Sequence, residues 1–234
     1  QYIVHHRRLR LGRLLDAADR WAVRRALLRA HVLTAEEVGS VSEHYGLPRE
    51  WFHYVPWPRA TEALEPLGSL PAEPLVLCAG RAYCDWPLVF DAARGAGWPL
   101  VVVCAGEDRR AVEELNERAG RPARVLVDLP REEFMALLQR ATVSIAAMIE
   151  RRRSQGQVRV ADAAAAGVPL VATRVLGIAG YVEDGVTGLL VEPGDAAGLR
   201  AAVDRVLADA ALAEALRGEA DDRSAQFATP QYFA

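Results

Sequence analysis

Residues 74–106, PLVLCAGRAYCDWPLVFDAARGAGWPLVVVCAG, decide the fold of most of this 234-residue chain. The stretch holds an apolar run at 74–80, a segment with helical spacing at 86–97 that ends in glycine, and a second apolar run at 99–106. Strands that are apolar throughout are typical of a parallel sheet covered on both faces, and a helix between two of them supplies the crossover. The stretch therefore predicts a strand–helix–strand unit of an α/β protein.

The same alternation continues toward the C-terminus. Further strands are predicted at 123–129, 142–148, 169–173 and 188–193, and further helices at 108–120, 130–141, 157–166 and 196–209. A polar helix and a proline break are expected after residue 214. We therefore expect an α/β fold with a doubly wound, Rossmann-like parallel sheet and right-handed crossovers.

The first 58 residues show a shorter version of this pattern. Residues 13–30 have helical spacing, and a short strand then ends at Thr34, a predicted N-cap with Glu37 three residues on. The helix that Thr34 opens should run to about Tyr45, before a second short strand in FHYVPWP. Residues 59–73 are rich in proline and lack periodicity, which indicates a linker. The predicted organisation is 1–58, a linker at 59–73, the sheet domain at 74–222 and a tail at 223–234.

Composition narrows the function classes. The formal net charge of -3 gives no general attraction to nucleic acid or acidic membranes, so we expect no nucleic-acid partner. All 28 basic residues are arginine, so any basic contact to an anion is made by a planar guanidinium. The 3 cysteines lack the spacing of a disulfide framework or a zinc site and predict reduced thiols in the cytoplasm.

The chain shows no targeting or membrane signal. No apolar run reaches the roughly 20 residues of a membrane span, and the first residues lack the apolar core of a signal peptide. Peripheral membrane contact and the oligomeric state stay open. Because the chain begins at Gln1 rather than at methionine, we expect it to be a fragment of a longer protein.

Two strand ends carry the candidate binding residues, since ligands of an open parallel sheet bind outside its carboxyl ends. Gly80 lets a ligand approach the backbone, and Arg81 follows at once. Gly156 precedes the helix that starts at Gln157 and Val158, whose free amides would hold phosphate. We expect these two sites to grip one diphosphate from opposite sides.

The stretches DAAAAGVPLVAT (162–173) and EDGVTGLLVEPGD (183–195) carry a family resemblance. They resemble the C-terminal domain of GT-B fold glycosyltransferases of family four, the group-one glycosyl transferases, whose pattern is E-A-M-A-x-G-x-P-V-V-A-T followed by E-D-G-x-T-G-L-L-V-x-P-x-D. Gly80-Arg81 is similar to the start of the family's G-R…K-G element. The resemblance covers about 74–234, and residues 31–58 resemble the end of the family's N-terminal, acceptor-side domain, most of which is absent.

The resemblance implies transfer of a sugar from a nucleotide-diphospho-sugar to an unknown acceptor, with retention at the anomeric carbon. It implies no metal and no cofactor besides this co-substrate. Asp162 would turn its carboxylate toward the ribose hydroxyls, and Leu129, after the third strand of the sheet, would flank the base. Asp85 is a further donor-binding candidate, although a helix N-cap explains it equally well.

The sequence departs from the family pattern at the catalytic acids. The family has two acids eight residues apart, and these fall here on Ser154 and Asp162. Glu150, four residues before Ser154, is a second candidate, so the catalytic assignments are Glu150 and Ser154. Ser154, Gly156 and Gln157 resemble an S-x-G-Q turn found in some branches. A tryptophan, Trp86, stands near the family's lysine and is expected to line the cleft.

Other functions remain open. A nucleotide-sugar epimerase shares the fold but relies on several acids and histidines that are not evident here. A non-catalytic nucleotide-binding or partner-binding module is the other alternative, which Ser154 permits. A Rossmann dehydrogenase is disfavoured because AGRAYC follows the first strand of the sheet in place of G-x-G-x-x-G.

Overall fold

The computed structural model describes residues 10–57, 73–151 and 154–224, and the chain divides into two compact units, Gln1–Pro56 and Trp57–Ala234. The predicted linker at 59–73 and the tail at 223–234 lie almost wholly outside the described residues. The domain limits therefore stay predictions. Among the described residues, no helix has the length and apolar character needed to cross a membrane.

The first unit is a small α/β arrangement. Its two strands pair in parallel, with Ala30 opposite Phe52, and Gly46 is the C-cap of the helix between them. The Thr34 hydroxyl accepts from the Glu37 amide at 3.3 Å, which confirms the predicted N-cap. The elements in chain order are α1 (Arg10–Ala26), β1 (Ala30–Val32), α2 (Ala35–Tyr45), the 3-10 helix η1 (Arg49–Trp51) and β2 (Phe52–Tyr54).

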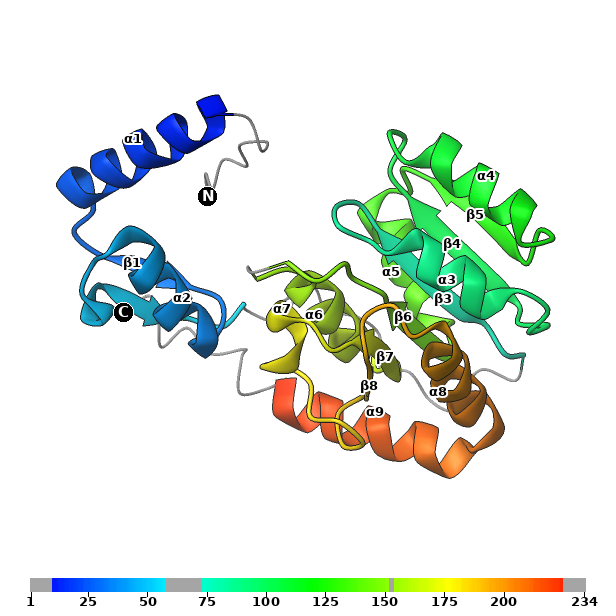
Figure 1. Ribbon diagram of the computed structural model, residues 1–234. Helices are drawn as coiled ribbons and strands as arrows, with labels where there is room; N and C mark the ends of the chain where they lie inside the picture. The colour runs from blue at the N-terminus through cyan, green and yellow to red at the C-terminus, as the bar shows by residue number, and fades with distance from the viewer. Residues whose placement is uncertain (1–9, 58–72, 152–153, 225–234) are drawn as a thin grey trace. The chain divides into compact units, whose positions relative to one another are not determined.

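The second unit is built on a six-stranded sheet in which every neighbouring pair is parallel, as predicted (Figure 1). The strand order is β5-β4-β3-β6-β7-β8. The chain therefore adds β4 and β5 on one side of β3 and then crosses over to add β6, β7 and β8 on the other side. The strands are β3 (Val76–Gly80), β4 (Leu100–Cys104), β5 (Ala123–Val127), β6 (Val143–Ala146), β7 (Leu170–Thr173) and β8 (Leu189–Val191).

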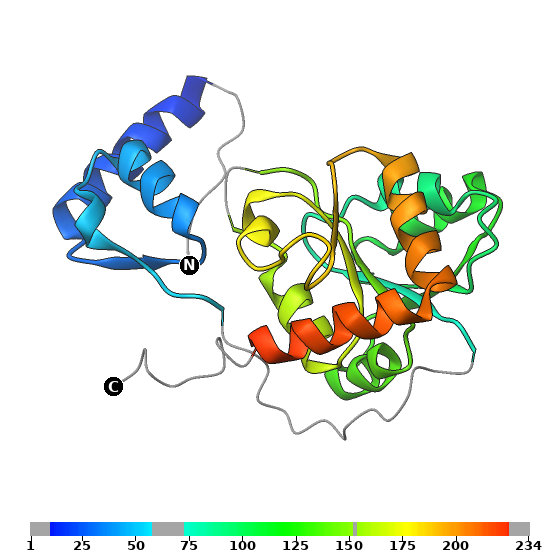
Figure 2. The same cartoon turned by 90° about the horizontal axis from the view of Figure 1, so that it is seen from below.

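Helices cover both faces of this sheet (Figure 2). Alternate residues of β3 show this, because Val76 and Cys78 pack in one core cluster with α3, α4 and α8, whereas Leu77 and Ala79 pack in another with α5. Ala146 of β6 packs with α6 on the same side as α5. The helices are α3 (Trp86–Ala93), α4 (Arg109–Arg118), α5 (Arg131–Gln139), α6 (Gln157–Ala165), α7 (Leu176–Ala179), α8 (Ala196–Ala208) and α9 (Ala210–Ser224). The predicted doubly wound α/β fold is confirmed.

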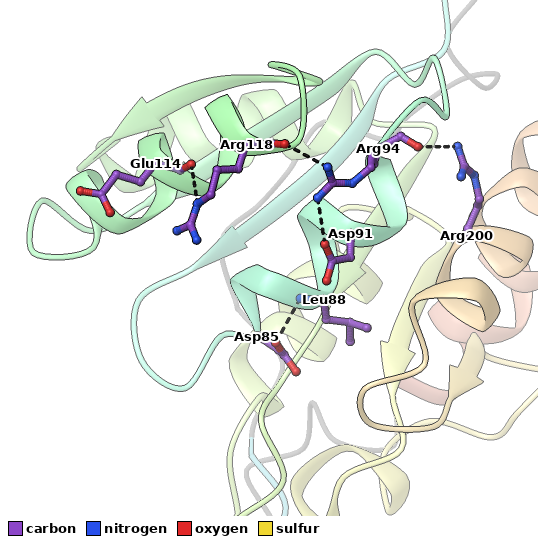
Figure 3. A network of polar contacts seen from close by, with 7 residues as sticks. All are labelled: Asp85, Leu88, Asp91, Arg94, Glu114, Arg118 and Arg200. Carbon is purple, nitrogen blue, oxygen red and sulfur yellow. Dashed lines mark hydrogen bonds and ion pairs between the residues drawn. The ribbon is translucent and has the colours of Figure 1, made fainter.

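A surface network joins the helices of one face (Figure 3). Arg94 follows α3 and donates to the Arg118 carbonyl of α4 at 3.0 Å, while Arg200 of α8 donates to the Arg94 carbonyl at 3.0 Å. At the other end of α3, the Asp85 carboxylate caps the helix by accepting from the Leu88 amide at 3.1 Å. Each of these hydrogen bonds contributes about 0.5–1.5 kcal/mol, and they lie at both ends of the helix that starts at the carboxyl edge of the sheet.

Candidate functional site

The candidate site lies at the carboxyl ends of β3 and β6, where the strand order reverses. The loops that follow these two strands pair with each other through an isolated antiparallel bridge between Cys84 and Met148. The Asp85 amide donates to the Ala147 carbonyl at 3.0 Å, and the Ile149 amide donates to the Tyr83 carbonyl at 2.9 Å. The structure thus joins the two strand ends that the sequence singled out, at the position where open α/β sheets bind ligands.

Gly80 ends β3 under its own loop. A Cβ at this position would lie 1.6 Å from the Cys84 sulfur and 3.3 Å from the Trp86 ring. The expected cleft-lining role of Trp86 is wrong, because its side chain is buried in the core between α3 and the sheet. Gly80 therefore allows the loop to fold back over the strand end, and its direct approach to a ligand stays a prediction.

Arg81 projects from the same strand end with its side chain 69% exposed. Its guanidinium lies 3.9 Å from the Asp128 carboxylate, at the end of β5. Asp128 also accepts from the Gly106 amide at 3.1 Å, so it connects the ends of β4 and β5. An exposed pair at this distance is weak, which leaves the guanidinium able to move to an anion. The joint grip on a diphosphate by Arg81 and α6 stays a prediction.

The second strand end leads into α6 through Gly156. This residue is the N-cap, with φ +91°, and no side chain of the described residues caps the helix. The Gly156 carbonyl accepts from the Arg159 and Val160 amides at 2.9 and 3.2 Å. The amides of Gln157 and Val158 precede these two and belong to the set that a helix leaves without an intrahelical partner. The start of α6 thus has the form of an anion site.

Two buried glutamines flank this helix start. Gln157 is 4% exposed, and within the described chain its Nε2 has no hydrogen-bond partner. Gln155 donates to the Ile149 carbonyl, whereas its Oε1 likewise has no partner among the described residues. A buried amide group without a partner costs about 1–3 kcal/mol. Such groups beside a helix start are suited to a polar ligand.

Asp162 lies in the second turn of α6 with its side chain 4% exposed. Both of its oxygens accept from Arg131, the first residue of α5, at 2.8 Å each. Its predicted contact with ribose stays a prediction. Arg131 was not anticipated from the sequence, because nothing in the residue pattern links positions 31 apart on two helices.

The remaining predicted residues surround this centre. Leu129 is half-buried against the core under α5, and Val158 is 43% exposed on the first turn of α6. Glu150 is exposed, and Ser154 is half-buried. Arg151 lies with its guanidinium carbon 6.0 Å from the centre of the Tyr83 ring, which connects the two loops again. The catalytic assignments to Glu150 and Ser154 stay predictions.

The cysteines near the site are two buried thiols, Cys78 and Cys104, and one half-buried thiol, Cys84. Burial raises the pKa of Cys84 to about 11, and nearby Arg159 opposes this rise. Burial also raises the pKa of Cys78 and of Cys104. These thiols are therefore protonated at neutral pH and are poor nucleophiles. Across residues 10–57, 73–151 and 154–224, no three histidine, cysteine, aspartate or glutamate side chains cluster as metal ligands would.

The fold defines a Rossmann-like α/β protein with a candidate ligand site at the switch point of its sheet, and comparison with known proteins gives the family. A model described as glycosyl transferases group 1 matches residues 82–209, more than half of the chain. The chain belongs to the group 1 glycosyl transferases. The resemblance predicted from DAAAAGVPLVAT and EDGVTGLLVEPGD is confirmed.

Individual relatives match parts of the chain. It is 36% identical over 117 residues to a D-inositol 3-phosphate glycosyltransferase of Corynebacterium urealyticum, which covers 47% of the chain and 27% of that relative. A glycogen synthase of Mycobacterium tuberculosis is 39% identical over 99 residues, or 42% of the chain and 23% of the synthase. The chain thus matches only about a quarter of the length of these relatives.

Solved structures share the fold over most of the chain. A glycosyltransferase from Rickettsia africae has a TM-score of 0.74 at 14% identity, covering 92% of this chain and 63% of its own. Anabaena HepE in complex with UDP-glucose has a TM-score of 0.71 at 15% identity, covering 90% and 63%. Both similarities support the GT-B architecture.

Proposed function

We propose that this chain is the donor-binding part of a glycosyltransferase that transfers a sugar from a nucleotide-diphospho-sugar to an acceptor, with retention. Membership in the group 1 family supports the reaction class. The observation that carries the proposal is the α6 start, which no described side chain caps, beside buried glutamine amides without partners, at the switch point of the sheet. This arrangement suits the diphosphate of a donor.

Each predicted residue takes a role in this proposal. The amides of Gln157 and Val158 hold the diphosphate, Gly156 gives them access, and Arg81 moves from Asp128 to the phosphate oxygens. These groups stabilise the negative charge that develops on the leaving diphosphate as the bond to the sugar breaks. Metal and other cofactors have no part in the proposal.

The other parts of the donor are assigned to neighbouring residues. Leu129 packs on the base, and Asp162 with Gly80 and Asp85 lines the ribose and sugar side. Glu150 and Ser154 lie on the loop before α6 and are placed nearest the anomeric carbon. Of these two, Glu150 has the carboxylate that could stabilise positive charge on the sugar. The acceptor, peripheral contact with a membrane and the oligomeric state are left open.

A thermal-shift screen with UDP, GDP, ADP and dTDP tests the donor site. A ligand at 100 times its dissociation constant adds about 2.7 kcal/mol of stability. For a unit of this size, that corresponds to a rise in melting temperature of about 5–11 °C. UDP is the first choice because HepE was solved with UDP-glucose. Absence of a shift with all four diphosphates would overturn the proposal, and R81A should reduce the shift that wild type gives.

One observation favours a second candidate, a non-catalytic nucleotide-binding module. Ser154 stands where the family pattern has an acid. Release of nucleoside diphosphate from UDP-glucose or GDP-mannose would exclude this second candidate, since a non-catalytic module binds a sugar nucleotide without cleaving it. The anomeric configuration of any product, read by NMR, tests retention. We place the protein in the cytoplasm, where free cysteines such as these three stay reduced.

A further inference from the structure

The carboxylate proposed to meet the ribose is already held by an arginine. Arg131 Nη1 and Nη2 donate to Asp162 Oδ2 and Oδ1, both at 2.8 Å. This is the planar, two-point geometry that only a guanidinium forms with a carboxylate. Since each oxygen is engaged, Asp162 cannot rotate about its side-chain torsions without breaking a contact. The orientation of the acid is thus set by a residue of another helix.

Arg131 and Asp162 lie between the residues assigned to the base and those assigned to the diphosphate. Arg131 comes two residues after Leu129, which is assigned to the base, while Asp162 lies on the helix whose first amides are assigned to the diphosphate. The ion pair therefore spans the base side and the phosphate side at the place where ribose would lie. The Arg131 side chain is 42% exposed and that of Asp162 is 4% exposed, so the arginine lies at the open edge of the pair.

The Asp162 carboxylate can accept a hydrogen bond from a ribose hydroxyl while it stays paired with Arg131. A carboxylate has about four acceptor positions, and Arg131 occupies one on each oxygen. A hydroxyl that donates to a remaining position replaces no existing bond. An aspartate has one side-chain torsion fewer than the glutamate of the family pattern, so a single two-point contact is enough to fix the direction of its oxygens. A guanidinium fork supplies this orientation.

We propose that Arg131 is a positioning residue that fixes Asp162 for recognition of the ribose 2′-hydroxyl of the donor nucleotide. The inference rests on the proposed function, because it needs a nucleotide diphosphate at this site. The alternative is a purely structural ion pair that joins α5 to α6. The two differ in one respect: a structural pair affects stability alone, whereas a positioning pair also sets the preference for ribose over deoxyribose.

The test measures dissociation constants by calorimetry for UDP and 2′-deoxy-UDP, or for GDP and 2′-deoxy-GDP if the screen selects guanosine. Wild type should prefer the ribonucleotide by about tenfold or more, as expected for one hydrogen bond to a charged group. R131Q should weaken ribonucleotide binding about tenfold and bring the preference close to 1, with little effect on the deoxynucleotide. D162N should do the same, and the double variant should be no worse than either single variant.

Two further variants protect the test against unfolding and nonspecific charge effects. R131K keeps the charge but loses the fork, so it should fold and retain only part of the preference. R140Q removes an exposed arginine at the other end of α5 and should leave the preference as in wild type.

The outcomes separate this inference from the proposed function. A wild-type protein that binds no nucleoside diphosphate overturns both. A wild type that binds but does not prefer ribose overturns this inference alone. The same follows if R131Q and R131K lower the melting temperature and keep the wild-type preference, since Arg131 is then a structural cross-link.

Discussion

Replacing Gly156 with alanine tests whether the start of α6 is both crowded and functional. A Cβ at this position would lie 2.8 and 2.9 Å from Cγ1 and Cδ1 of Ile178. Ile178 is fully buried, so its side chain has little room to give way. Such overpacking costs about 1–3 kcal/mol. The backbone angle φ of +91° adds about 1–2 kcal/mol for any residue with a Cβ.

Gly120 provides the matched control. Its φ of +88° is nearly the same, but a Cβ there would meet no atom within 4 Å. G120A should therefore cost only the backbone term of about 1–2 kcal/mol, and G156A should cost about 1–3 kcal/mol more. Any gain from a less flexible unfolded chain is common to both variants and cancels. At about 2–4 °C per kcal/mol for a unit of this size, G156A should melt about 2–12 °C below G120A.

Two measurements check this expectation. Differential scanning calorimetry gives the melting temperatures, and I178V, which removes Cδ1, should cost less in the G156A background than in wild type. Binding of the selected nucleoside diphosphate should weaken at least tenfold in G156A and stay unchanged in G120A. Equal melting temperatures for the two variants would refute the crowding argument. Unchanged affinity in folded G156A would refute the place of this helix start in the donor site.

Three other changes have defined outcomes. D85N keeps an N-cap side chain and should change the free energy of unfolding by only a few tenths of a kcal/mol. Weaker nucleotide binding by D85N would therefore reveal a contact with the donor. Unchanged binding would show that Asp85 is only a helix cap. T173V removes a fully buried hydroxyl that accepts from the Met148 amide at 2.8 Å. Urea unfolding should show that the free energy of unfolding falls by about 1–3 kcal/mol. A fall of less than about 0.5 kcal/mol would contradict this. Because the pKa of Cys84 is raised from 9.0 to about 11, the unfolded thiol ionises first, and stability should fall as pH rises from about 9 to 11. C84A should reduce this slope in urea titrations, and an identical slope would argue against the raised pKa.

The sheet was predictable because buried parallel strands leave an unmistakable pattern. The apolar runs at 74–80 and 99–106 contain β3 and β4, and the helix predicted at 157–166 agrees with α6 to within one residue. Predicted ends are less accurate, since apolar character continues past the last ladder bond. The helix expected to reach residue 97 ends at Ala93, ahead of Gly95, whose φ is +67°.

The missed features depend on tertiary packing. The four residues of α7 (Leu176–Ala179) are too few to show a helical period. Nearly every residue of α3 is apolar, so the sequence does not say which of them face the core, and Trp86 was wrongly placed in a cleft. The Arg131–Asp162 pair needs the relative position of two helices, which a linear pattern does not contain.

The scaffold of the site depends on close backbone approach more than on polar side chains. A Cβ on Gly80 would lie 1.6 Å from the Cys84 sulfur, and one on Gly177 would lie 2.1 Å from the Gln155 carbonyl oxygen. The missing side chains at these two glycines let the loops after β3 and β6 lie directly against their neighbours, and this does not depend on the polar residues nearby. The departures from the family pattern at Ser154 and Asp162 therefore leave the arrangement of the strand ends intact, and under the proposed function they change only the side chains that face the donor. In the proposed site, substitution of Ser154 should therefore affect transfer and leave nucleotide binding intact, whereas substitution of Asp162 should reduce the preference for ribose.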